Sequence, residues 1–140
     1  MTVAGQLNPS TRTEASLLLV EDDPQIVRAI APAFEVSGYA VTIAATGREA
    51  IDMVDRRNWD ALIVDLGLPD VDGKSVIAHV RAQGNTPVVV ISARNSPSEV
   101  EAARDAGANC FMHKPFRTPQ LLDWVGQQMG APGSTIFAEV

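Results

Sequence analysis

An uninterrupted apolar run, Ala61-Leu62-Ile63-Val64, is followed directly by Asp65. This run constrains the fold of the chain more than any other segment. The turn that follows, residues 66–73, is rich in Pro, Gly and Asp. A short apolar run bounded by turn residues is typical of a strand that is buried on both faces of a parallel sheet. Open sheets of this kind keep their ligands at the carboxyl ends of the strands. The run therefore predicts that Asp65 lies at the ligand-binding edge of the protein.

Short apolar segments alternate with amphipathic ones along the rest of the chain. The five predicted strands are residues 16–20, 40–44, 61–64, 87–91 and 109–112. A helix is expected after each strand, because apolar residues recur there at helical spacing. Pro32 lies inside the first helical pattern and predicts a kink or a break. Strands joined by helical crossovers favour an α/β fold, with a parallel sheet and helices on both of its faces.

The same pattern sets the expected limits of the folded domain. Residues 1–15 are predicted to be a flexible leader, 16–130 the domain and 131–140 a flexible tail, because both ends lack a hydrophobic pattern. Within the domain, Val36 is assigned to the core-facing stripe of the first helix. Thr118 is assigned to the N-cap of the last helix, with a proline directly after it.

Charge and composition argue against several classes of function. A net charge of −6 and a pI near 4.7 disfavour a large nucleic-acid surface within this chain, since phosphate binding needs clustered Lys and Arg. The sequence holds no apolar run near the ~18 residues of a membrane span and no secretory signal at its N-terminus. The single cysteine, Cys110, suits a reducing compartment. We therefore expect a cytoplasmic location.

Polar groups follow four of the predicted strands. Glu21 and Asp22 come after the first strand, Asp65 after the third, Ser92 after the fourth and Lys114 after the fifth. Because the carboxyl ends of parallel strands share one edge, these groups should converge. Three carboxylates repel one another unless a cation lies among them, and oxygen ligands at a wet edge suit Mg²⁺. An ammonium and a hydroxyl beside them could hold phosphoryl oxygens, which predicts a site where a carboxylate attacks phosphorus.

Four segments within residues 16–130 resemble the motifs of bacterial two-component response-regulator receiver domains. In order, they read Leu-Leu-Val-Glu-Asp-Asp-Pro, Val-Asp-Leu-Gly-Leu-Pro-Asp-Val-Asp-Gly, Val-Val-Ile-Ser-Ala and Lys-Pro-Phe. One such motif is weak evidence, but four in the family's order and spacing are very specific. The resemblance implies a flavodoxin-like (βα)5 doubly wound parallel sheet with strand order 2-1-3-4-5, counted along the chain. It also implies a role in phosphorelay signal transduction.

The resemblance assigns a phosphoacceptor and a metal site. Asp65 would accept the phosphoryl group from a sensor histidine kinase or a histidine phosphotransfer protein. Mg²⁺ would be held by Asp22, Asp65 and the backbone carbonyl of Gly67, with Glu21 helping through water. The chain would then be a phosphoacceptor switch rather than an enzyme with a separate substrate, although it would catalyse its own phosphorylation and dephosphorylation.

The resemblance also assigns the residues around the phosphoryl group. Ser92 and Lys114 would contact its oxygens, and Ala93 would offer a backbone N–H. Phe111 occupies the position of the aromatic residue that turns inward together with Ser92 in the active state. The fourth helix, fifth strand and last helix would form the surface that binds a downstream protein. The Lys114–Pro115 bond would be cis, which is tolerable only before proline.

Three positions depart from the family pattern. Phe111 has no hydroxyl group, so switching is expected to be less sharply two-state. Gly67 and Arg94 stand where the family tunes the lifetime of the phosphate, so that lifetime is left open. Residues 107–111 lack the paired acids of receivers that dimerise in winged-helix regulators, which weakens the case for that kind of dimer.

Other polar and aromatic residues have plainer interpretations. Asp70 and Asp72 are expected to shape the turn and cap the next helix rather than bind metal. His79 and His113 are expected to be solvated rather than catalytic. Trp124 is either a partly covered surface residue or an anchor for a partner.

Of three alternatives to a lone receiver, one remains open and two are disfavoured. The chain could be the receiver part of a longer DNA-binding regulator. An aspartyl-nucleophile phosphatase of the haloacid dehalogenase type is disfavoured. Such an enzyme requires a second Asp, as general acid, two residues after the first, and Gly67 occupies that position. A flavin-binding electron carrier is disfavoured because no Ser/Thr/Gly-rich phosphate loop follows the first predicted strand.

Overall fold

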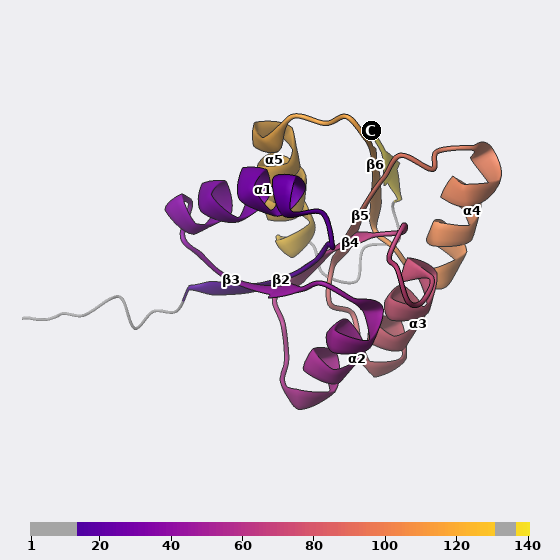
Figure 1. The fold of residues 1–140 in the computed structure, drawn as a ribbon, viewed down its shortest axis with the longest axis horizontal. Helices are drawn as coiled ribbons and strands as arrows, with labels where there is room; N and C mark the ends of the chain where they lie inside the picture. Colours follow the sequence, from indigo (N-terminus) through magenta and orange to yellow (C-terminus); the bar gives the residue numbers. More distant parts are fainter. Residues whose placement is uncertain (1–13, 131–136) are drawn as a thin grey trace, which may run out of the picture.

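A parallel sheet forms the middle layer of the protein, with helices on both of its faces (Figure 1). The computed structural model describes residues 14–130 and 137–140. The predictions made for residues 1–13 and 131–136 lie outside the described residues. No helix in the two described stretches is long and apolar enough to cross a membrane.

The described residues form six strands and five helices. The strands are β2 (Ala15–Val20), β3 (Tyr39–Ala44), β4 (Ala61–Asp65), β5 (Val88–Ser92), β6 (Cys110–His113) and β7 (Ala138–Glu139). The helices are α1 (Pro24–Val36), α2 (Gly47–Arg56), α3 (Gly73–Gln83), α4 (Pro97–Ala106) and α5 (Thr118–Met129). The strand order is β3-β2-β4-β5-β6-β7, and every pairing is parallel. The five expected strands therefore adopt the expected order 2-1-3-4-5, which confirms the flavodoxin-like topology.

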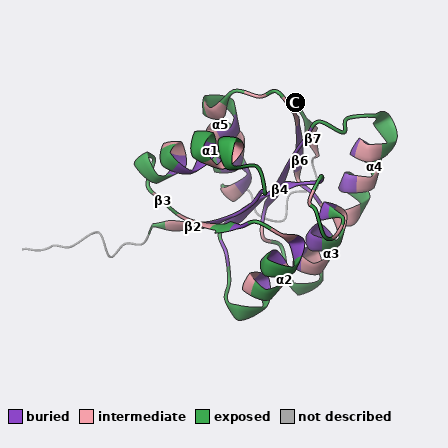
Figure 2. Ribbon diagram, viewed as in Figure 1, coloured by how far each residue is buried: buried purple, intermediate pink, exposed green. Residues whose placement is uncertain are grey.

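The core lies in two layers, one on each face of the sheet. Helices α1 and α5 cover one face and α2, α3 and α4 cover the other (Figure 1). Every residue of β4 and β5 is buried, as expected for central strands covered on both faces (Figure 2). The apolar run that ends at Asp65 is therefore the centre of the sheet, which fixes where that carboxylate emerges.

The first helix confirms one expectation and corrects another. Asp23 caps α1, because its Oδ1 accepts a hydrogen bond from the Gln25 N–H at 2.9 Å. Pro32 lies within the helix, which continues past it rather than splitting. Val36 is 90% exposed, so its assignment to the core was wrong. It follows the buried Phe34 by two residues, and a helix turns by about 200° over two residues, so Val36 faces away from the sheet.

The start of α5 also differs from the prediction. Thr118 is the first residue of the helix, and Arg117 holds the N-cap position that was assigned to Thr118. A proline is tolerated at either of the first two helical positions, since neither N–H bonds within the helix. The Thr-Pro pair therefore could not fix the boundary to one residue.

The strand β7 was not expected. Residues 131–140 were assigned to a flexible tail, yet Ala138 and Glu139 pair with Cys110 and Phe111 of β6. Four described residues are too few to show a strand pattern in the sequence. They form a strand here because they lie beside the edge of β6, whose backbone groups they pair.

Candidate functional site

The carboxyl ends of four strands bring the expected site together. Asp65 is the last residue of β4, Ser92 is the last residue of β5, and Lys114 directly follows β6. Glu21 and Asp22 directly follow β2. The parallel topology thus places residues up to 93 positions apart at one edge of the sheet, where the Lys114 ammonium meets the Glu21 carboxylate.

Three of these residues form an acidic cluster. Glu21, Asp22 and Asp65 each offer a carboxylate oxygen, and these oxygens lie within 4.8 Å of one another. Glu21 is 1% exposed and Asp65 is 7% exposed, whereas Asp22 is exposed. Hard oxygen ligands at a site that is partly open to water match the preference of Mg²⁺. The chemistry of these donors therefore fits the metal that the sequence predicted.

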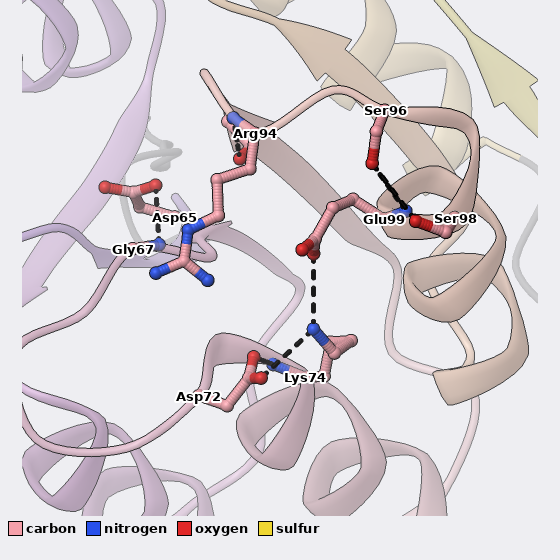
Figure 3. Close-up of polar contacts among 9 residues, drawn as sticks. Asp65, Gly67, Asp72, Lys74, Arg94, Ser96, Ser98 and Glu99 are labelled. Atoms are coloured by element: carbon pink, nitrogen blue, oxygen red, sulfur yellow. Dashed lines mark hydrogen bonds and ion pairs between the residues drawn. The ribbon is translucent and has the colours of Figure 1, made fainter.

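Lys114 lies against the acidic cluster. Its Nζ is 3.2 Å from Asp65 Oδ2 and 3.5 Å from Glu21 Oε1. The other Asp65 oxygen, Oδ1, accepts a hydrogen bond from the Gly67 N–H at 3.1 Å (Figure 3). Both carboxylate oxygens of Asp65 therefore have partners that fix the orientation of the group.

Burial disfavours the negatively charged form of the Glu21 carboxyl group. Burial raises the pKa of the Glu21 carboxyl to about 7, against the opposing effect of the Asp23 backbone N–H that it accepts at 3.1 Å. Repulsion from Asp65 raises the pKa further, and Lys114 lowers it. A cation among these groups would offset the same cost.

Ser92, the last residue of β5, and Ala93, which follows it, form one side of the site. Ser92 is 1% exposed, and its Oγ accepts a hydrogen bond from the Arg94 N–H at 2.9 Å. Ala93 is exposed and borders a cleft of about 470 Å³ that Lys114 also lines. The cleft therefore lies beside Lys114, on the side of the site that follows β5.

Phe111 is fully buried on β6. It belongs to the core layer under α2, α3 and α4, and its ring centroid lies 5.2 Å from that of His113. The resemblance assigns the inward position of this aromatic residue to the active state, so its part in switching stays a prediction.

A polar bridge beside the site was not found from the sequence. Lys74 Nζ lies 3.0 Å from Asp72 Oδ2 and 3.4 Å from Glu99 Oε1, so Lys74 links α3 to α4 (Figure 3). The Arg94 side chain extends toward the loop that carries Gly67 and Asp72. Lys74 gave no signal in the sequence, because a lone lysine on a helix is usually solvated.

The remaining singled-out residues have structural partners. Asp70 accepts the Gly47 N–H at 2.8 Å and the Arg48 N–H at 3.0 Å, and Asp72 caps α3. His79 Nε2 lies 2.8 Å from Asp55 Oδ1. Asp72 caps the next helix as expected, whereas Asp70 accepts from the first N–H groups of the preceding helix, α2, instead.

Three further features singled out from the sequence lie in the second half of the chain. The Lys114–Pro115 peptide bond is cis, as expected. Cys110 is fully buried, and burial raises the pKa of its thiol to about 12. Trp124 is half-buried against the core layer under α1 and α5. Its possible use as a partner anchor stays a prediction.

Known proteins resemble the chain in sequence. Residues 17–126 match the family model described as the response regulator receiver domain. The transcriptional regulatory protein KdpE of Mycobacterium tuberculosis is 40% identical over 106 residues, which are 76% of this chain and 47% of that protein. The response regulator MprA of Mycobacterium leprae is 38% identical over 107 residues, again 76% of this chain and 47% of its own length. The chain thus spans about half the length of these relatives.

Solved structures resemble the chain in fold. The receiver domain of the Francisella response regulator 1452 has a TM-score of 0.77 at 30% identity, covering 83% of this chain and 97% of its own. The receiver domain of the sensor histidine kinase PA1611 from Pseudomonas aeruginosa has a TM-score of 0.78 at 30% identity, covering 85% of this chain and 100% of its own. That structure has a magnesium ion coordinated in its active site cleft.

Proposed function

Because the chain belongs to the response-regulator receiver family, we propose that it accepts a phosphoryl group on Asp65 from a histidine kinase or a histidine phosphotransfer protein. The observation that carries the proposal is the position of Asp65. It is the one carboxylate of the described acidic cluster that ends the central strand, and Lys114 and the Gly67 N–H hold its two oxygens. A carboxylate fixed in this way is oriented to act as a nucleophile.

The proposal includes Mg²⁺ as the cofactor. Asp22 and Asp65 would be direct carboxylate ligands, the Gly67 carbonyl a third, and Glu21 would act through a water molecule. When bound, the ion would neutralise part of the negative charge on the phosphoryl oxygens. The magnesium ion in the PA1611 receiver supports this assignment, as does the Glu21–Asp22–Asp65 cluster of this chain.

Asp65 would carry out the attack on phosphorus, and its neighbours would bind the phosphoryl oxygens. An Asp65 oxygen attacks phosphorus, and the P–N bond of the donor phosphohistidine breaks as the new O–P bond forms. The imidazole nitrogen leaves with the electron pair of the broken bond. Lys114, Ser92 and the Ala93 N–H hold the oxygens of the transferred group. Small phosphodonors should serve as well, since the acceptor side of the reaction belongs to this chain.

Phosphorylation would then shift the protein between two conformations. The new group adds nearly two negative charges beside Lys114 and Ser92. Ser92 ends β5 and Lys114 directly follows β6, the strand that contains Phe111. Movement of Ser92 and Lys114 would therefore be transmitted to Phe111 through these two strands. The surface formed by α4, β6 and α5 would change with them and bind a downstream protein. This is a population shift between existing conformers.

Chemical trapping of the acceptor tests the proposal. The protein is incubated with a small phosphodonor and Mg²⁺ and then reduced with borohydride, which converts an aspartyl phosphate to homoserine. Peptide mass spectrometry should find homoserine in place of Asp65, and this product should be absent when Mg²⁺ is replaced by a chelator. Homoserine at Asp22, or at neither residue with an active donor, would contradict the assignment.

A second candidate is a receiver within a longer transcriptional regulator. It is favoured by the length comparison, since KdpE and MprA are about twice as long as their match to this chain. The mass of the native protein, measured with an antibody against residues 16–130, separates the two. A mass near 14.9 kDa supports the lone receiver. A mass about 1.6 times larger supports the longer regulator, since 106 residues are 47% of KdpE, which is therefore about 225 residues long against the 140 of this chain.

A further inference from the structure

Asp70 ties the loop between β4 and α3 to a helix that lies earlier in the chain. Its Oδ1 accepts the Gly47 N–H at 2.8 Å, and its Oδ2 accepts the Arg48 N–H at 3.0 Å. These are the first two residues of α2, and N–H groups at a helix start have no partner within the helix. Thr46, the N-cap of the same helix, accepts the Glu49 N–H with its Oγ1 at 3.1 Å. Asp70 and Thr46 therefore satisfy different donors at one helix end.

The carboxylate of Asp70 is suited to this position. The positive end of the helix dipole favours a negative charge. The hydrogen bond from the Gly47 N–H lowers the pKa of the Asp70 carboxyl group, so the group is ionised at neutral pH. The next side chain, Val71, packs against the core layer under α2, α3 and α4. A Cβ at position 47 would overlap Val71 Cγ2, so glycine permits this close approach of the loop to α2.

The same loop also holds the carboxylate of Asp65. Gly67 lies three residues before Asp70, and its N–H donates to Asp65 Oδ1 at 3.1 Å (Figure 3). Residues 67–72 belong to no helix or strand, and most of them are exposed. An exposed segment of irregular structure has little buried surface to hold it, so its position depends on individual anchoring contacts. Asp70 supplies such a contact in the middle of the loop.

We propose that Asp70 is a positioning residue for the acidic site: by binding the first turn of α2, it keeps Gly67 in place against Asp65. The inference rests on the function proposed above, in which Asp65 and the Gly67 carbonyl hold Mg²⁺. Without Asp70, the loop would have to be ordered when the ion binds, and ordering a mobile group costs free energy at that moment. Loss of Asp70 therefore weakens Mg²⁺ binding more than it slows the transfer step.

The first test needs neither a metal nor a phosphodonor. Backbone order parameters of the full chain are measured by ¹⁵N NMR relaxation in the presence of a chelator. Asp70→Ala should lower the order parameter of the Gly67 amide from about 0.85 to below about 0.6, while that of the Ile63 amide in β4 is unchanged. Thr46→Ala is the matched control, because it also removes a side-chain acceptor from the start of α2 but lies outside the loop. A rigid Gly67 in Asp70→Ala, or equal loosening in Thr46→Ala, would overturn the proposal.

The second test separates metal binding from phosphoryl transfer. The rate of phosphorylation by acetyl phosphate is measured over a range of Mg²⁺ concentrations. Asp70→Ala should raise the half-saturating Mg²⁺ concentration by about tenfold or more, as residues that orient metal ligands do, but lower the rate at saturating Mg²⁺ by less than about threefold. Asp70→Asn keeps one oxygen acceptor and should have a smaller effect. An unchanged half-saturating concentration in Asp70→Ala, or an equal rise in Thr46→Ala, would overturn the proposal.

Failure of the proposed function would give a different result. If the unmodified protein acquires no phosphate from acetyl phosphate of shown activity, the role of Asp65 as phosphoacceptor is contradicted. The Kd for Mg²⁺, measured by calorimetry, then decides the role of Asp70. A Kd about tenfold higher in Asp70→Ala than in the unmodified protein supports that role, and an equal Kd overturns it.

Discussion

Asp65 illustrates how a single residue acquires its chemistry from its neighbours. Its carboxylate is nearly buried, yet Lys114 and the Gly67 N–H each hold one of its oxygens. The lone carboxylate at the end of an apolar run was evident from the sequence, and so was the need for a cation near it. The distances to Lys114 were not, because they depend on how β4 and β6 are spaced across β5.

Removing the Lys114 ammonium should slow phosphorylation. Lys114→Met keeps an unbranched side chain one atom shorter but leaves Glu21 and Asp65 without their shared cation. We expect the rate of phosphorylation by a small phosphodonor to fall by about tenfold or more, because a donor that holds the phosphoryl oxygens is lost. Phosphoprotein formed over time is the measurement. Lys74→Met, which breaks the bridge to Asp72 and Glu99 instead, is the control and should keep the normal rate; equal loss in both variants would contradict this role.

Cys110 should be chemically silent in the folded protein. Burial raises the pKa of its thiol to about 12, so the reactive thiolate stays scarce as the pH rises through 7 to about 9. A thiol reagent should therefore label almost no native protein over this range and one thiol per chain after unfolding. Fast labelling of the native protein would show that β6 opens far more readily than its burial indicates.

At the scale of elements, the sequence predicted the kinds of segment better than their ends. The strands β4 and β5 were evident because both faces are covered and their sequences are continuously apolar. Val36 and Thr118 were misplaced because helical spacing does not say where a helix stops contacting the sheet or which residue starts it. The strand β7 was missed because its stability comes from β6, not from a pattern of its own.

The junction between β4 and α3 depends on Gly73. A Cβ at this position would lie 2.7 Å from the Asp65 carbonyl and 2.8 Å from Leu66 Cα, both backbone atoms that cannot simply move aside. Gly73→Ala should therefore lower the free energy of unfolding by about 1–3 kcal/mol, measured by urea denaturation. Gly67→Ala is the matched control, since its Cβ would come no closer than 3.8 Å to a described atom. A stable Gly73→Ala protein would mean that this junction is looser than the structure indicates.

At the scale of the whole molecule, the topology gathers the site. Four crossover connections join the strands from β2 to β6 in the same sheet, so groups from β2, β4, β5 and β6 share one edge. The convergence of the polar groups that follow these strands could therefore be predicted from the strand pattern, whereas Gly67 and Ala93 were assigned only by the resemblance. The bridge from Lys74 to Glu99 and the capping of α2 by Asp70 could not, because they depend on how neighbouring helices and loops pack.

Mg²⁺ should stabilise the whole fold through the acidic cluster. A ligand that binds only the folded state raises the free energy of unfolding, by about 2.7 kcal/mol at a concentration of 100 times its Kd. The melting temperature should rise with Mg²⁺ and return to its starting value on addition of a chelator. Asp22→Asn should abolish the rise, whereas Asp52→Asn, on the exposed face of α2, should retain it. A rise that persists in Asp22→Asn would place the ion elsewhere.

The intact mass of the protein after incubation with a small phosphodonor tests the assignment of Asp65 most directly. We predict a single added phosphate of ~80 Da that requires Mg²⁺ and is absent from the Asp65→Asn variant. The variant should melt as a folded protein, so that the loss reflects the acceptor and not the fold. An equal mass increase in Asp65→Asn, or none in the unmodified protein with a donor shown to be active, would contradict the role of Asp65 as the phosphoacceptor.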